Sequence, residues 1–155
     1  MLENREVTWF PSYGGEMRGG TANCTVIISD ELIASPIVKN PDILVVMNDQ
    51  SIRKFQPQLR QMGILLFDSS LIKNPELRSD IEVVGVPATD ISKTIGNTKS
   101  ANMVLLGALI AKTKLLKEGS MFEALEDSVN HRKEVVVMNK RAIREGIRFF
   151  EDKKG

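Results

Sequence analysis

The glycine-rich segment from Pro11 to Gly20 holds the residues best suited to contact a ligand. Two glycine pairs enclose Glu16-Met17-Arg18, directly after a short strand pattern. Glycine permits positive φ and the close approach of another group, and a guanidinium can bind a phosphate or a carboxylate with two hydrogen bonds. Ligands of open α/β sheets bind beyond the carboxyl ends of the strands. The segment is therefore a candidate binding loop, and the alternative is a surface turn with a solvated Arg18.

The same segment lacks the features of known phosphate loops. It has no Gly-x-Gly-x-x-Gly spacing. A strand pattern follows it, whereas a dinucleotide site or a P-loop would place a helix there, with its N-terminus facing the phosphates. Nucleotide binding by this loop alone is therefore disfavoured.

A second candidate segment runs from Gly96 to Asn102, at the predicted start of a helix. Free backbone N–H groups at a helix start can hold an anion, here with Lys99 nearby. Ser and Thr strongly favour capping positions. The favoured interpretation is therefore ordinary capping of the helix by Thr98 or Ser100.

The chain contains one cysteine, Cys24, and one histidine, His131. No intrachain disulfide can form. An iron–sulfur cluster is held by about four thiolates and a structural zinc by about four Cys or His ligands, so this chain alone can hold neither. An electron-transfer centre would have to lie on another subunit. Cys24 lies inside an apolar strand face and is predicted to fill core space, and His131 is predicted to be a solvated surface residue.

Composition favours one globular domain over residues 1–155. Charged residues make up 26% of the chain and the net charge is +1, so no strong field draws it to nucleic acid or to an anionic membrane. The longest apolar stretch, Ala101 to Ala111, has about half of the roughly 20 residues that a membrane-spanning helix needs. No signal peptide pattern opens the chain. A cytoplasmic protein is expected.

The hydrophobic pattern predicts an α/β domain. Strands are expected over residues 5–10 and 22–29, the second with its apolar residues at period two. The continuous apolar run 43–47 is typical of a strand covered on both faces, and such strands occur in parallel sheets. Further strands are predicted over residues 64–67 and 81–86.

Helical patterns alternate with these strands. A first stripe runs from Ile52 to Met62 and is ended by Gly63, and a short helix covers residues 88–95. Later helices are predicted over residues 99–116, from the capping box Ser120–Glu123 onwards, and from Val136 to Phe150. The order strand, helix, strand is a crossover unit. The expected architecture is a three-layer Rossmann-like domain with a mainly parallel sheet.

From Val7 to about Phe150 the chain resembles the gamma subunits of 2-oxoacid:ferredoxin oxidoreductases, particularly those acting on 2-oxoglutarate or branched-chain 2-oxoacids. The resemblance rests on several strings, of which the first is the most specific: Tyr13-Gly14-x-Glu16-Met17-Arg18-Gly19-Gly20, Thr21-Ala22-Asn23-Cys24, Ser29-Asp30, Ser35-Pro36, Gly96-Asn97, Ala101-Asn102-Met103 and Gly107-Ala108-Leu109. It implies the fold of domain III of pyruvate:ferredoxin oxidoreductase.

The resemblance also implies an activity and a set of partners. The family decarboxylates a 2-oxoacid oxidatively to its acyl-CoA thioester, with thiamine diphosphate, coenzyme A and [4Fe–4S] clusters, and passes the electrons to ferredoxin. The cofactors are implied to belong to alpha, beta and delta subunits, so that this chain binds none alone and contributes no catalytic residue. The residues implied to line an interface or a cofactor are Tyr13, Gly14, Glu16, Met17, Arg18, Gly19, Gly20, Asn97 and Asn102.

Two departures from the family pattern accompany the resemblance. Gly15 stands where the family typically has proline. Relatives also begin earlier, with a strand, a Gly-Gly-Gln-Gly turn and a helix, so a partner or a second copy of this chain is expected to fill that place, unless the chain starts upstream of Met1. The alternative functions are a free-standing nucleotide- or acyl-CoA-binding domain and a purely structural subunit.

Overall fold

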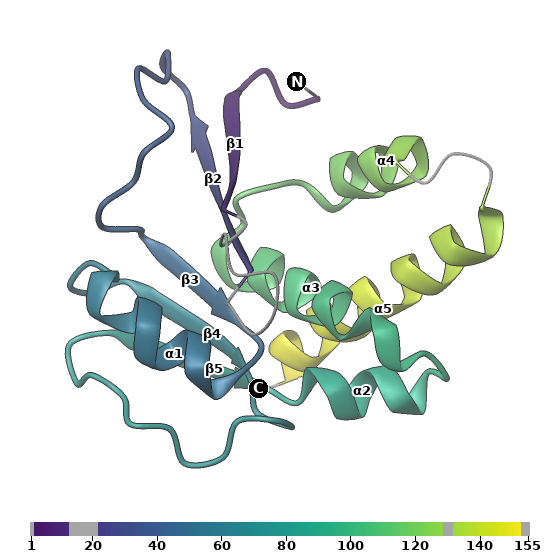
Figure 1. Ribbon diagram of the computed structural model, residues 1–155. Coiled ribbons are helices and arrows are strands. Elements are labelled where there is room, and N and C mark those ends of the chain that lie inside the picture. Colours follow the sequence, from purple (N-terminus) through teal and green to yellow (C-terminus); the bar gives the residue numbers. More distant parts are fainter. Residues whose placement is uncertain (1, 13–21, 129–131, 153–155) are drawn as a thin grey trace.

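The computed structural model describes residues 2–12, 22–128 and 132–152 (Figure 1). A β-hairpin opens the chain, a parallel β-sheet with one crossover helix follows, and helices complete the fold. The described residues therefore confirm the expected α/β architecture.

The hairpin consists of β1 (Glu6–Ser12) and β2 (Asn23–Ser29), which pair antiparallel and form a two-stranded sheet of their own. Its register sets Trp9 opposite Val26, so the two side chains share one face. Both are exposed, as is Cys24 on the same face. The prediction that Cys24 fills core space is therefore wrong, because period-two alternation shows that residues share a face and does not show that the face is covered.

The parallel sheet has the order β3-β4-β5, with β3 (Ile43–Val46), β4 (Ile64–Asp68) and β5 (Glu82–Val86). Both strand pairs are parallel, as the apolar runs predicted. The apolar run of β3 was expected to be covered on both faces. This prediction is wrong, because β3 lies at the edge of the sheet and the side chain of Val45 is 41% exposed.

The crossover from β3 to β4 contains α1 (Asp49–Phe55) and the 3₁₀ turn η1 (Gln56–Gln58). Asn48 caps α1, because its Oδ1 accepts a hydrogen bond from the Ser51 backbone N–H at 2.8 Å. The helix was predicted to reach Met62. It ends seven residues earlier because Pro57 has no N–H for a helical hydrogen bond and its ring excludes an uninterrupted turn.

Helices cover both faces of the parallel sheet. On one face α1 packs against β3 and β4, and the buried residues are Val46, Ile52, Leu59, Leu65, Phe67 and Ile72. On the other face two helices pack against β4 and β5: α2 (Ala88–Thr94) and α3 (Ala101–Thr113). The core there contains Leu66, Val86, Ala88, Ile95, Val104, Leu105 and Ala108. The result is the three-layer arrangement expected from the sequence.

The ends of α2 and α3 differ in part from the sequence prediction. Gly96 follows α2 with φ +84°, a conformation that glycine adopts without strain, as predicted. The turn η2 (Thr98–Ser100) leads into α3. The long helix was expected to reach residue 116 but ends at Thr113, because Lys114 adopts a left-handed conformation with φ 54°.

Two more helices close the fold, α4 (Glu118–Ser128) and α5 (Lys133–Asp152). The predicted capping box at Ser120 is wrong, because Ser120 lies inside α4. A residue near the N-terminus contacts the chain directly before α4. The Glu3 carboxylate accepts a hydrogen bond from the Lys117 backbone N–H at 2.7 Å. This hydrogen bond lowers the pKa of Glu3.

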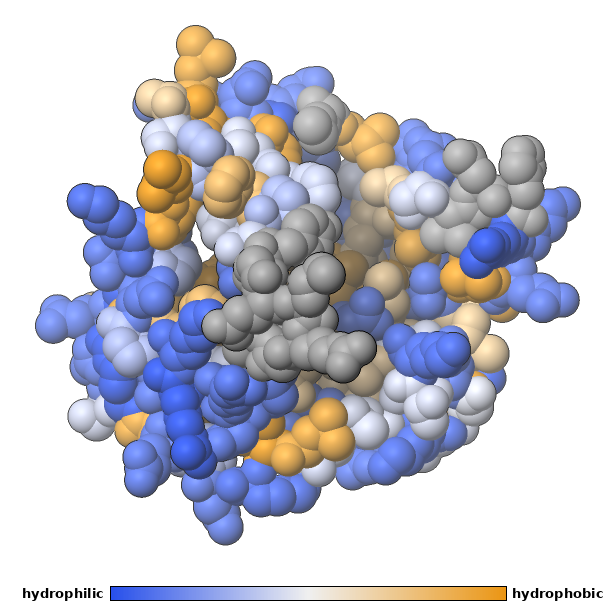
Figure 2. Space-filling model, in the orientation of Figure 1, coloured by the Kyte–Doolittle hydropathy of each residue, from blue (hydrophilic) through white to orange (hydrophobic). Residues whose placement is uncertain are grey.

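Glu3 and Arg5 hold the hairpin to the connection between α3 and α4. Besides the Glu3 contact, the Arg5 guanidinium donates to the Leu115 carbonyl at 3.1 Å and pairs with Asp30 at 3.1 Å. In Figure 1 the two strands of the hairpin stand above the parallel sheet. In Figure 2 the surface over the upper part of the molecule is mixed, with orange apolar patches between white and blue residues.

Candidate functional site

The predicted binding loop connects the two strands of the hairpin. Its candidate residues lie outside the described residues: Tyr13, Gly14, Glu16, Met17, Arg18, Gly19 and Gly20. The structure does describe the strand ends that flank this loop. Ser12 pairs with Asn23 at the end of the β1–β2 ladder. β1 belongs to an antiparallel hairpin, so the rule for carboxyl ends of parallel strands does not apply to this loop.

Asn97 lies in a polar network at the start of α3. Its Oδ1 accepts from the Lys99 backbone N–H at 3.1 Å, and its Nδ2 donates to the Ser100 hydroxyl at 2.7 Å. That hydroxyl reaches Asn139 of α5 at 3.4 Å. The prediction that Thr98 or Ser100 caps the long helix through its side chain is wrong, because Asn97 caps the 3₁₀ turn η2 and Ser100, at the N-cap of α3, makes no side-chain capping hydrogen bond. Asn102 lies one turn away and is exposed.

A buried carboxylate was missed by the sequence analysis. Asp68 ends β4 and is fully buried. It accepts hydrogen bonds from the Thr89 hydroxyl at 2.5 Å, from the Thr89 backbone N–H at 3.2 Å and from the Ser70 backbone N–H at 3.0 Å. Its signal in the sequence was an acidic residue directly after a buried strand. Because these donors occupy the carboxylate, Asp68 joins β4 to the start of α2 and is not poised as a base.

Arg78 forms a second polar junction. Its Nη1 donates to the main-chain carbonyls of Gln56 at 3.0 Å and Leu59 at 2.6 Å, and its Nε donates to the Asp80 carboxylate at 2.8 Å. The hydrogen bond from Arg78 lowers the pKa of Asp80, and the carboxylate in turn raises the pKa of Arg78. The arginine therefore satisfies the carbonyls at the end of the α1 segment.

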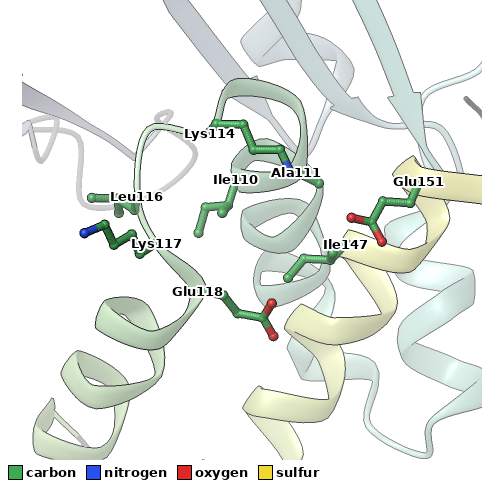
Figure 3. A pocket seen from close by; sticks show the side chains of 8 residues that line it. All are labelled: Ile110, Ala111, Lys114, Leu116, Lys117, Glu118, Ile147 and Glu151. Carbon is green, nitrogen blue, oxygen red and sulfur yellow. The ribbon is translucent and has the colours of Figure 1, made fainter.

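A shallow cavity of about 370 Å³ lies between the ends of α3 and α5 and the start of α4 (Figure 3). Ile110 and Ile147 form its apolar wall, and Glu118 and Glu151 point toward it from opposite sides. Both carboxylates are exposed. The cavity holds none of the residues singled out in the sequence.

The described residues bring together no recognisable catalytic constellation. No group of three or more Cys, His, Asp or Glu side chains within them could hold a metal ion. Cys24 stands alone and exposed on β2, while His131 lies outside the described ranges. No helix within these ranges is long and apolar enough to cross a membrane.

Comparison with known proteins decides the family. Residues 1–149 match the family model described as pyruvate ferredoxin/flavodoxin oxidoreductase. The chain belongs to this family. Among relatives of the pyruvate ferredoxin/flavodoxin oxidoreductase family, the 2-oxoglutarate synthase subunit KorC of Methanocaldococcus jannaschii is 38% identical over 133 residues, which are 83% of this chain and 70% of KorC. The resemblance inferred from the motifs is confirmed.

A second family member is much longer than this chain. The ketoisovalerate oxidoreductase subunit VorA of Methanothermobacter thermautotrophicus is 36% identical over 145 residues, which are 93% of this chain and 30% of VorA. The chain thus spans about a third of the length of VorA. The region that corresponds to this chain is one part of a larger polypeptide there.

Solved structures from the family share the fold. The gamma subunit of a keto/oxoacid ferredoxin oxidoreductase from Geobacter sulfurreducens superposes with a TM-score of 0.82 at 24% identity, over 97% of this chain and 83% of that one. The 2-oxoglutarate:ferredoxin oxidoreductase from Magnetococcus marinus gives 0.85 at 22% identity, over 96% of this chain and 26% of that one. At these identities the likeness shows the fold alone, and it supports the expected domain III architecture.

Proposed function

We propose that this chain is the gamma subunit of a cytoplasmic 2-oxoacid:ferredoxin oxidoreductase, which converts a 2-oxoacid to its acyl-CoA thioester and reduces ferredoxin. The observation that carries the proposal is the family match over residues 1–149, together with the likeness to KorC over 70% of that subunit. In this proposal alpha, beta and delta subunits and ferredoxin are the partners.

The cofactors of the reaction belong to the partner subunits in this proposal. A [4Fe–4S] cluster does not fit this chain, because about four thiolates are required and the sequence contains Cys24 alone. Thiamine diphosphate supplies an electron sink for decarboxylation when bound. The residues of this chain act by packing and by positioning, consistent with the structural roles of Asp68, Arg78 and Asn97.

Two substrate classes are supported by the relatives. KorC is named for 2-oxoglutarate and VorA for ketoisovalerate, at 38% and 36% identity. We expect the alpha and beta subunits to select between them. Activity of the complete complex with each 2-oxoacid, measured as ferredoxin reduction, would identify the substrate.

The loop from Tyr13 to Gly20, with Asn97 and Asn102, is proposed to face the subunit interface near thiamine diphosphate or coenzyme A. Its support is the glycine content and Arg18. Arg18→Ala in the complex should raise the KM for coenzyme A or lower the yield of assembled complex. Arg141→Ala, an exposed change on α5, is the control. Unchanged kinetics and yield for Arg18→Ala would remove this role.

Reconstitution tests the proposed function. The purified chain alone should not turn over a 2-oxoacid with a dye acceptor, whereas addition of the chain to its companion subunits should restore a complex that reduces ferredoxin. Turnover by the isolated chain would overturn the proposal. Failure of the chain to join any such complex would overturn it as well.

A further inference from the structure

Helix α4 covers an apolar floor that α3 and α5 form together. The floor consists of Ile110 on α3 with Ile143 and Ile147 on α5, and Met121 of α4 packs on it. All eleven residues of α4 are described, and Met121 alone among them is buried, whereas α3 buries seven of its thirteen residues. Burial of an apolar face supplies most of the free energy that holds a helix in a protein. Helix α4 is therefore held less firmly than α3.

The first turn of α4 is weakly packed, although the chain before it is held in place. The cavity of about 370 Å³ lies beside this turn and is lined by Glu118 (Figure 3). A Cβ atom at Gly119 would meet no described atom within 4 Å, and glycine inside a helix lowers its stability relative to alanine. The Glu3 carboxylate binds the Lys117 backbone N–H directly before this turn. The start of α4 is therefore an anchored end of a weak helix.

Charged side chains of α5 attach the later turns of α4. The Lys140 ammonium forms a salt bridge with Glu126 and lies 5.4 Å from the centroid of the Phe122 ring. The Arg144 guanidinium lies 4.9 Å from the same centroid. Ion pairs and cation–π contacts at an exposed surface each contribute little stability. Apart from Met121, the contacts that hold α4 on the floor are therefore few and lie near the surface.

We propose that α4 is a lid, which opens by local unfolding while the rest of the fold stays intact, and which uncovers the floor of Ile110, Ile143 and Ile147. Segments with few buried apolar contacts open locally in this way, at a lower free energy than the whole domain. The contacts of Lys140 and Arg144 with α4 keep the lid closed. The lid is a property of the chain itself and goes beyond the proposed function.

Hydrogen exchange of the full-length chain tests the opening. Peptides of residues 118–128 should have protection factors roughly a hundredfold below those of residues 101–113, because the amides of α3 exchange only when the whole domain unfolds. Low urea concentrations should lower the protection of α3 strongly and that of α4 little, since a local opening exposes little surface. Equal protection of the two helices would overturn the inference, because α4 would then leave the floor only on global unfolding.

Two substitutions should move the opening in opposite directions. Lys140→Met keeps the aliphatic part of the side chain and removes its charge, so it should lower the protection of residues 118–128 roughly five- to tenfold. Gly119→Ala raises helix propensity and should increase that protection about two- to fivefold. The control Arg53→Met removes an exposed ion pair with Asp49 in α1 and should leave it unchanged. Unchanged protection in Lys140→Met would show that the charged contacts do not hold the lid.

Thiol labelling measures directly whether the floor becomes accessible. Cys24, the one cysteine of the sequence, is first replaced by serine. Ile110→Cys then places a thiol on the floor, and the control Val104→Cys places one on the same helix in the core against the sheet. Circular dichroism establishes that both variants are folded. The floor thiol should react with a thiol reagent roughly a hundredfold faster than the core thiol, and equal rates would overturn the inference.

The same labelling distinguishes opening of the lid from direct access through the cavity, which Ile110 also lines. If the lid controls access, Lys140→Met should raise the labelling rate of Ile110→Cys and Gly119→Ala should lower it. A rate that neither substitution changes would mean that the reagent reaches the floor while α4 stays in place. That result would overturn the inference.

Discussion

Gly107 of α3 lies directly against the main chain of Ile143 in α5. A Cβ atom at Gly107 would stand 2.0 Å from the Ile143 carbonyl oxygen. The contact is reciprocal, since a Cβ atom at Gly146 of α5 would stand 2.0 Å from the Val104 carbonyl oxygen of α3. The two helices therefore cross with their backbones in contact. Since α3 packs on the parallel sheet, this crossing fixes where α5 lies.

Substitution at this crossing should be costly. Gly107→Ala and Gly146→Ala should each lower the free energy of unfolding by about 2 to 4 kcal/mol, because the helices must separate to admit the methyl group. Gly119→Ala in α4 is the control, since a Cβ there meets no atom within 4 Å. It should raise stability by about 0.5 kcal/mol. Urea denaturation followed by circular dichroism measures the free energy of unfolding of all three variants. Equal effects at Gly107 and Gly119 would contradict the backbone contact between α3 and α5.

Removal of the buried carboxylate of Asp68 should also destabilise the fold. Asp68→Ala leaves the Thr89 hydroxyl and the Thr89 and Ser70 backbone N–H groups without their acceptor, at a cost of about 2 to 4 kcal/mol. Asp90→Asn, an exposed acidic residue of α2, should leave the denaturation midpoint unchanged. A comparably small effect of Asp68→Ala would show that other groups satisfy these donors.

The Arg78–Asp80 pair predicts that the stability of the fold depends on pH in the acidic range. The pKa of Asp80 is lowered in the folded state below its ordinary value of 3.8, chiefly by the hydrogen bond from Arg78. The stabilisation is therefore present above pH 3.8 and is lost as the pH falls through the folded pKa. NMR titration of the Asp80 carboxyl should show its pKa returning toward 3.8 in Arg78→Met. The Glu3 pKa should stay low in both proteins, because its hydrogen bond comes from Lys117.

Met62 offers a stabilising change. It holds a left-handed conformation with φ 58°, and its side chain is 84% exposed, so little packing would be lost on its removal. Met62→Gly should raise the free energy of unfolding by about 0.5 to 1 kcal/mol, because glycine adopts this conformation without strain. Met62→Ala should give no such gain, since alanine retains the Cβ atom. Thermal denaturation of the two variants distinguishes the outcomes.

The strands and their order of alternation with helices could be predicted from the sequence, because burial leaves a clear hydrophobic period. The ends of the helices were harder to predict. Pro57 shortens the first helix and was overlooked among apolar residues at helical spacing. The left-handed Lys114 carries no sequence signal, since lysine seldom adopts that conformation. Exposure of Cys24 could not be predicted either, because it depends on whether another layer covers the hairpin.

The candidate site also contains residues that could be predicted from the sequence and residues that could not. Asn97 was found from its neighbours at a helix start, and the structure explains it as a cap. The donors to Asp68 come from two segments about twenty residues apart in sequence, so spacing could not connect them. The roles of the loop residues Tyr13 to Gly20 stay predictions that rest on the family motif.

The bond from Glu3 to the start of α4 has a consequence for how the chain folds. It joins positions 114 residues apart, so it can form only after most of the polypeptide has left the ribosome. Contacts of such high sequence separation form late and slowly, because a large loop must close first. During synthesis the hairpin would therefore remain unanchored, with the indole of Trp9 exposed to water, until the C-terminal third of the chain has been made.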